Sequence, residues 1–147
     1  MHYADGSALR LSVVGPDYPF LPGEDPGPAE HAEAWRAWLV EHADDVAVTE
    51  MGLSAAKSAA IPLGWEARDA VRELGETLTV LRIPDQAFPV AAMVAGVVPS
   101  VDAVHLGVAV ADPEITTFVT YARQTAQLAR MYGLDVLTPG LPDAWWV

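Results

Sequence analysis

Several residue types and sequence features are missing from this chain of 147 residues. It has no cysteine, which excludes disulfides, zinc–thiolate sites and cysteine nucleophiles, and which fits a reducing compartment. No apolar run reaches the roughly 18 residues of a membrane-spanning helix, because the longest candidate, residues 88–98, is short and contains Pro89. No basic region followed by an apolar run opens the chain, so we expect no signal peptide and a cytoplasmic location.

Basic residues are scarce. Eight Lys and Arg stand against twenty Asp and Glu, which gives a formal net charge of −12. Nucleic-acid backbones are bound largely through Lys and Arg, so a general nucleic-acid binder is disfavoured unless the few arginines cluster. Cations and basic proteins are the partners that this charge favours.

The rest of the composition indicates one folded domain over residues 1–147, since 52% of the residues are hydrophobic. Short apolar segments alternate with helical patterns, which predicts an α/β fold with a mostly parallel sheet flanked by helices. The predicted strands are residues 2–4, 46–48, 77–83, 115–121 and 134–137. The predicted helices are residues 8–11, 31–43, 53–60, 65–74, 85–98, 101–111 and 122–132.

Residues 15–30 interrupt this pattern with five prolines and three glycines. Proline lacks a backbone N–H and fixes φ, so this segment cannot continue a helix or a central strand. We interpret it as an inserted surface loop, either ordered or a mobile flap. Its position near one end of the chain gives no reason to divide the domain.

Two acids are placed for chemistry. Asp5 follows the first strand, and Asp102 lies in the first turn of a later helix. The carboxyl ends of parallel strands share one edge, where ligands usually bind, and the Tyr121–Ala122 junction ends another strand there. Both acids also have simpler interpretations, because Asp5 is placed to cap the first helix and Asp102 to interact with a helix dipole.

Four segments, taken in order, resemble the PIN domain family, in particular the VapC-type toxins of bacterial toxin–antitoxin systems. YADGSAL resembles the family's opening strand and acid, and VDAVHLGVAVA its Asp-containing helix. FVTYARQTAQLARMYGLDVLTPG resembles the closing strand, helix and strand, and MGLSAAKSAA is a weaker match to the third helix. The resemblance spans nearly the whole chain and implies a three-layer α/β/α sandwich.

The resemblance also implies a chemistry, the cleavage of single-stranded RNA by about four acids that hold Mg²⁺ or Mn²⁺. Asp5 matches the first acid and Asp102 the third, so both are the expected metal-binding and catalytic residues. The second and fourth acids should stand at Ala55 and Ala122, so half of the set is missing. Two carboxylates can still hold one hydrated Mg²⁺ weakly. The expectation is a toxin-like nuclease with weak or lost activity.

Other polar residues near these positions have two interpretations each. Ser7 and Thr120 either support the acids by hydrogen bonds or belong to a turn and a strand. His105 is expected as a core histidine rather than as a ligand. An active nuclease with relocated acids is a further hypothesis. The candidates for such substitution are Glu50, Asp112, Glu114, Asp17, Glu24 and Asp25.

A second class of function is a binding module that keeps the toxin scaffold, either for a homodimer or for an antitoxin-like partner. The expected partner presents a basic amphipathic helix to an acidic groove, and RNA is a partner only of an active enzyme. We expect Trp145 and Trp146 to dock on the domain or on a second subunit. The remaining side chains of interest are core or interface residues, or else solvated or RNA-contacting arginines: Trp35, Trp38, Arg123 and Arg130.

Overall fold

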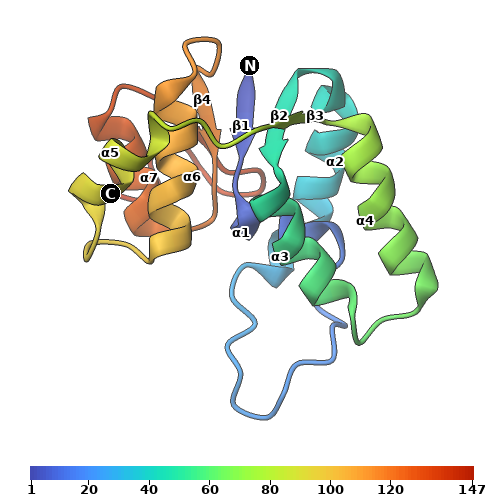
Figure 1. Cartoon of the computed structure of the whole chain (residues 1–147). Helices are drawn as coiled ribbons and strands as arrows, with labels where there is room; N and C mark the ends of the chain where they lie inside the picture. Colours follow the sequence, from blue (N-terminus) through green and yellow to red (C-terminus); the bar gives the residue numbers. More distant parts are fainter.

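A computed structural model describes residues 1–147 as an α/β fold around one parallel sheet (Figure 1). The five strands run in the order β3-β2-β1-β4-β5, and all neighbours are parallel. β1 therefore lies at the centre, with the chain winding outward from it in both directions. The strands are β1 (His2–Ala4), β2 (Val46–Thr49), β3 (Thr79–Leu81), β4 (Thr117–Val119) and β5 (Asp135–Leu137).

Helices connect the strands and cover both faces of the sheet, as crossovers between parallel strands require. The α-helices are α1 (Gly6–Leu9), α2 (Ala32–His42), α3 (Glu50–Ala60), α4 (Trp65–Thr77), α5 (Ala87–Val94), α6 (Ser100–Ala111) and α7 (Arg123–Met131). Three short 3₁₀ turns are η1 (Arg10–Ser12), η2 (Ala29–His31) and η3 (Ala43–Asp45). Figure 1 shows α2, α3 and α4 on one side and α5, α6 and α7 on the other.

The central strands are buried on both faces, and this makes the fold three-layered. Successive side chains of a strand point to opposite faces, and Tyr3 and Phe118 pack in one core while Ala4 and Val119 pack in the other. The first core lies against α5, α6 and α7, and the second contains Trp35, which is fully buried, between the sheet and α1 to α4. The predicted three-layer α/β/α sandwich is confirmed.

Some predicted boundaries were wrong. The helix predicted at residues 65–74 was expected to end before Gly75, but α4 continues through this glycine to Thr77. The helix predicted at residues 101–111 begins one residue earlier, because Ser100 is the first residue of α6 and Pro99 precedes it without a side-chain cap. The strands predicted at 77–83 and 115–121 are shorter, because only three residues of each pair with a neighbour.

The Pro-rich segment is a surface loop that packs against the domain at its base. Tyr18 donates a hydrogen bond of 2.7 Å to the Ala59 carbonyl of α3, and its ring packs against Phe20. Val14, Ala29 and Ala59 form a small buried cluster under the loop. Figure 1 shows the remainder of the loop extending away from the sheet.

No helix of the chain combines the length and the apolar character needed to cross a membrane.

Candidate functional site

Asp5 lies at the carboxyl end of β1 and is the N-cap of α1. Its Oδ1 accepts hydrogen bonds from the Ser7 hydroxyl at 2.6 Å and from the Ala8 N–H at 3.1 Å. Its Oδ2 accepts a hydrogen bond from the Thr120 hydroxyl at 2.6 Å. The side chain is completely buried. Asp5 is therefore a helix cap, the simpler of its two interpretations, and Ser7 and Thr120 both donate hydrogen bonds to it.

The hydrogen bonds around Asp5 continue into the ends of two further strands. The backbone N–H of Tyr121 donates to the Ser7 hydroxyl at 2.9 Å, and the N–H of Ala122 donates to the Thr120 hydroxyl at 3.0 Å. Thr138, which follows β5, donates to the Thr120 carbonyl at 2.7 Å. These polar groups fasten the carboxyl ends of β1, β4 and β5 to one another.

Asp102 faces the same region from the first turn of α6 and is half-buried. Burial raises its pKa, the negative charge of Asp5 raises it further, and the nearby His105 partly offsets both effects. Burial likewise raises the pKa of Asp5, against the lowering effect of the hydrogen bonds that it accepts. Asp5 therefore lies close enough to Asp102 for its charge to disfavour the ionised form of Asp102.

His105 is a core histidine, as predicted. It is 1% exposed, and its Nδ1 lies 2.6 Å from the Tyr3 hydroxyl. Its Nε2 has no hydrogen-bond partner. Burial lowers the pKa of this imidazole to about 4, so the ring is neutral at neutral pH. Burial raises the pKa of the Tyr3 hydroxyl, which therefore stays protonated.

The two alanines that stand where the resemblance expects acids also lie at this edge of the sheet. A β-carbon added to Gly6 would lie 3.2 Å from the Ala55 methyl group, so α3 presents position 55 next to the residue that follows Asp5. Ala122 is the N-cap of α7 and has no side-chain oxygen for that role. Its N–H reaches Asp5 through the Thr120 hydroxyl. All four positions of the predicted acid set are thus brought to one edge.

The donor set at this edge does not fit a divalent ion held as the PIN resemblance implies. Mg²⁺ needs several oxygen ligands in near-octahedral geometry, whereas the Asp5 carboxylate is buried and already accepts three hydrogen bonds. Nowhere in the chain do three or more His, Asp or Glu side chains form a group that could hold a metal ion. A metal-binding role for Asp5 with Asp102 stays a prediction.

The acids considered as substitutes lie elsewhere. Glu50 is exposed at the start of α3, where its carboxylate lies 3.5 Å from the Lys57 ammonium. Asp112 caps the opposite end of α6 from Asp102 and accepts a hydrogen bond from the N–H of Glu114. The remaining three are exposed on the Pro-rich loop: Asp17, Glu24 and Asp25. None of these six carboxylates contributes to the raised pKa of Asp5.

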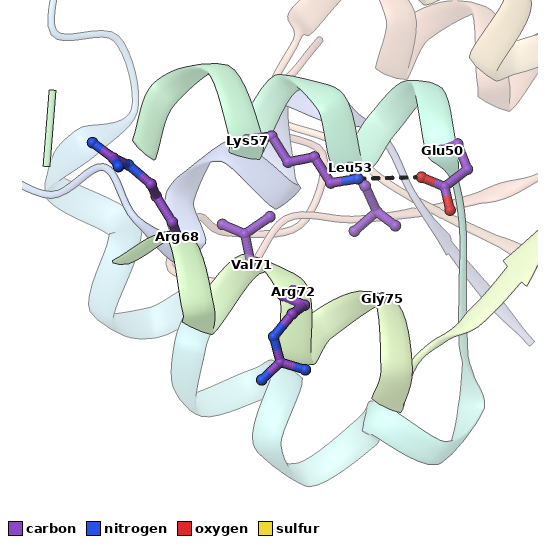
Figure 2. A pocket seen from close by; sticks show the side chains of 7 residues that line it. All are labelled: Glu50, Leu53, Lys57, Arg68, Val71, Arg72 and Gly75. Atoms are coloured by element: carbon purple, nitrogen blue, oxygen red, sulfur yellow. Dashed lines mark hydrogen bonds and ion pairs between the residues drawn. The ribbon is translucent and has the colours of Figure 1, made fainter. Parts of the chain in front are cut away.

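Sequence reasoning missed a groove of about 450 Å³ between α3 and α4 (Figure 2). Leu53 and Val71 point toward one another from the two helices, and Gly75 leaves its part of α4 without a side chain. The rest of the lining is charged and consists of Glu50, Lys57, Arg68 and Arg72. Three of the eight Lys and Arg residues therefore lie here. The interior glycine of α4 was the one sequence signal that could have indicated it.

The C-terminal tryptophans dock on their own domain, one of the two predicted arrangements. The Trp145 indole N–H donates a hydrogen bond of 2.7 Å to the Thr138 hydroxyl. The Trp146 carbonyl accepts hydrogen bonds from Arg123 and Gln127 of α7. Arg123 is thus engaged within the chain, and on the same helix Arg130 lies 2.8 Å from the carboxylate of Asp135.

Comparisons of the chain with protein-family models, with curated proteins and with solved structures found no match. The resemblance to the PIN family rests on the four sequence segments quoted above. What the structure adds is the parallel α/β fold and the shared edge at which Asp5, Asp102, Ala55 and Ala122 lie.

Proposed function

We propose that this chain is a VapC-like PIN-domain protein whose metal-dependent ribonuclease site has degenerated, leaving RNA cleavage weak or lost. Two observations support the proposal that this edge derives from a PIN-type nuclease site. Asp5 and Asp102 approach each other at the carboxyl edge of a parallel sheet, where ligands of such folds bind. Ala55 and Ala122 lie at that edge, at the two positions where the resemblance expects acids.

The observation that carries the proposal is the state of the Asp5 carboxylate. Three hydrogen bonds from the protein engage its two oxygens, and no solvent reaches it. Hydrolysis of a phosphodiester by bound metal needs an open, well-oriented ligand set that activates water and stabilises charge on phosphate. The alanines at positions 55 and 122 supply no oxygen ligands. Asp5 therefore acts as a helix cap that stabilises the fold, and not as part of a metal-binding ligand set.

RNA cleavage with restored acids tests this proposal. Single-stranded RNA is incubated with Mg²⁺ or Mn²⁺ and with the wild-type protein, Ala55→Glu/Ala122→Asp, or that double variant with Asp5→Asn added. We expect background cleavage by the wild type, metal-dependent cleavage by the double variant, and loss of that gain with Asp5→Asn. Robust metal-dependent cleavage by the wild type that Asp5→Ala abolishes would refute the degeneration.

A second candidate function, protein binding, is favoured by the groove between α3 and α4. Glycine inside a helix costs about 1 kcal/mol relative to alanine, yet a β-carbon on Gly75 would make only an ordinary contact of 3.5 Å with Leu53. Nothing within the chain requires a glycine there, and its absent side chain keeps the groove open. Beyond the end of α3, Ile61 is 67% exposed and Trp65, which begins α4, is 72% exposed. Such exposed apolar side chains are typical of binding surfaces.

The charge of the groove differs from the acidic groove expected from the net charge. Lys57, Arg68 and Arg72 outnumber Glu50 along its lining. A partner segment of matching chemistry carries carboxylates beside apolar anchors, in the manner of an amphipathic helix laid into a groove. On this proposal the antitoxin-like partner is acidic where it meets α3 and α4.

A matched pair of designed helical peptides tests the second candidate by calorimetry. Both carry the same leucine positions, and their polar faces carry either Glu or Lys. We expect the Glu peptide to bind the wild type, to lose affinity with Gly75→Leu, which fills the groove, and to keep it with Val40→Glu, an exposed site on α2. Preferential binding of the Lys peptide would show that net charge, not the groove, selects the partner.

A further inference from the structure

His105 is buried with one of its two ring nitrogens unused. Its Nδ1 lies 2.6 Å from the Tyr3 hydroxyl, whereas its Nε2 has no hydrogen-bond partner. Folded proteins pair nearly all of their buried polar groups, because a buried donor or acceptor without a partner costs free energy. The unused nitrogen of a histidine that is only 1% exposed therefore needs an explanation.

A short chain of hydrogen bonds determines which ring nitrogen of His105 carries the proton. The Thr49 hydroxyl accepts a hydrogen bond from the Gly52 N–H at 3.1 Å, and its own proton faces the Tyr3 hydroxyl oxygen at 3.4 Å. The Tyr3 hydroxyl in turn donates to Nδ1 of His105, since the reverse direction would leave the Thr49 proton without an acceptor. A neutral imidazole has a single N–H. That proton is therefore on Nε2.

The Nε2–H of His105 faces the space between Gly6 and Ala55. A β-carbon added to Gly6 would lie 3.6 Å from Nε2 and 3.2 Å from the Ala55 methyl group. A β-carbon added to Gly52 would lie 3.2 Å from Cε1, the ring atom between the two nitrogens. Nε2 and the Ala55 methyl group thus lie close to one common point. A side chain longer than a methyl group at position 55 can reach this nitrogen.

The group that satisfies such a donor is an oxygen acceptor, and no protein group supplies one. Ala55 ends in a methyl group at the position where the resemblance expects an acid. Both oxygens of Asp5 already accept hydrogen bonds from other groups. Asp102 lies one turn before His105 on α6 but does not bond to Nε2. The donor therefore marks a place for an acceptor that Ala55 does not provide.

We propose that His105 is a positioning residue of this edge, whose Nε2–H holds and orients a carboxylate carried at position 55. This inference rests on the proposed function, in which position 55 belongs to an acidic ligand set. In this role His105 touches neither metal nor RNA. It acts through the carboxylate by fixing the direction of its lone pairs, as hydrogen-bonding groups behind a metal ligand do. Ala55 leaves this positioning group in place without its acceptor.

NMR of the His105 imidazole tests the inference without metal or RNA. Long-range proton–nitrogen spectra of the wild type should show the proton on Nε2 at neutral pH. In Ala55→Glu the Hε2 resonance should move downfield and exchange more slowly with water, because a carboxylate accepts a strong hydrogen bond from it. Ala55→Leu, the matched control, fills the same space without an oxygen and should produce no such shift. Ala55 is half-buried, and circular dichroism verifies that both variants are folded.

The kinetics of the enzyme with restored acids provide a second readout. In Ala55→Glu/Ala122→Asp, adding His105→Phe should lower kcat for RNA cleavage by about tenfold or more, the usual effect of removing a group that orients a metal ligand. KM for RNA should change little, because His105 does not touch the substrate. Adding His105→Gln in place of His105→Phe should recover part of kcat, since the glutamine amide can still donate a hydrogen bond.

Three results would overturn the inference. One is a wild-type proton on Nδ1, because Nε2 would then face position 55 as an acceptor. Another is an Hε2 resonance that Ala55→Glu and Ala55→Leu shift alike. The third is a kcat of the folded restored enzyme that His105→Phe does not change. If Ala55→Glu/Ala122→Asp cleaves no RNA, the proposed function fails, and the NMR result still decides the role of His105.

Discussion

The Thr120 hydroxyl donates a hydrogen bond of 2.6 Å to Oδ2 of Asp5, across 115 positions of the chain. This bond joins the end of β4 to the end of β1, while Oδ1 of the same carboxylate caps α1. An acid at the position expected for a catalytic residue therefore contributes to the stability of the fold. The stability of Asp5 variants can therefore distinguish a structural role of this carboxylate from a catalytic one.

Asp5→Ala should lower the free energy of unfolding by about 2 kcal/mol, because it removes a helix cap and leaves the Ser7 and Thr120 hydroxyls without their acceptor. Asp5→Asn keeps an oxygen for the Ala8 N–H and should cost less than about 1 kcal/mol. Urea unfolding followed by tryptophan fluorescence measures both. A more stable Asp5→Ala variant would show instead that the carboxylate is held there at the expense of stability, as in a working site.

The stability of the protein should fall as the pH is lowered from about 6.5 to about 4. The pKa of His105 is depressed to about 4 by burial, so the unfolded chain binds a proton in this range and the folded chain does not. Above pH 6.5 this histidine costs the folded protein no stability. Below about pH 4 the loss from this one group reaches its maximum of about 3 kcal/mol. The raised pKa values of Asp5 and Asp102 oppose it, because these carboxyls gain protons more readily in the folded state.

His105→Gln isolates the histidine contribution, because glutamine does not titrate. Unfolding midpoints in urea, measured from pH 4 to pH 7, should depend less on pH in this variant than in the wild type. Equal slopes for the two proteins would mean that His105 titrates normally in the folded state, against its burial.

Two glycines inside helices should respond in opposite ways to alanine. Gly107→Ala should destabilise the protein by about 2 kcal/mol or more, because the new methyl group meets the backbone of Ala87 and pushes α5 away from α6. Gly75→Ala should raise stability by up to about 1 kcal/mol, because alanine favours the helix and makes an ordinary contact with Leu53. Thermal unfolding of both variants checks this, and destabilisation by Gly75→Ala would remove the argument that the glycine keeps the groove open.

Position 122 should accept a capping side chain. Ala122→Asn should stabilise the protein by about 1 kcal/mol, because α7 begins at Arg123 with no side-chain cap. Ala122→Asp supplies the same cap but adds a charge near Asp5 and Asp102, so it should stabilise less. Chemical denaturation of both variants measures the difference, and that difference should shrink at high salt. An Asp variant more stable than the Asn variant would indicate a bound cation at this edge.

Much of the fold was predictable because local chemistry and tertiary structure agree. All five strands were predicted near their positions, and the helix predicted at residues 53–60 lies within α3, which Thr49 caps by accepting a hydrogen bond of 3.1 Å from the Gly52 N–H. Asp5 as a cap followed from the strand–Asp–helix order alone. The positions of the strand ends could not be predicted from the sequence, because pairing with a neighbouring strand, and not β-propensity, determines where a strand ends.

The errors lie where distant segments decide the outcome. Gly75 looked like a helix end, but packing of α4 on α3 extends the helix past it. The groove beside it could not be predicted, because its lining comes from two helices that only the folded chain brings together. For the site, the sequence predicted which residues share an edge, but not that hydrogen bonds already engage both oxygens of Asp5.

Titration of Mn²⁺ into the purified protein by calorimetry, with Asp5→Ala as the control, tests the central claim most directly. If the Asp5 carboxylate is committed to the Ser7, Ala8 and Thr120 hydrogen bonds, the wild type should show no saturable binding up to millimolar metal, and Asp5→Ala should behave in the same way. Saturable binding by the wild type that is lost in Asp5→Ala would contradict the account and establish Asp5 as a metal ligand.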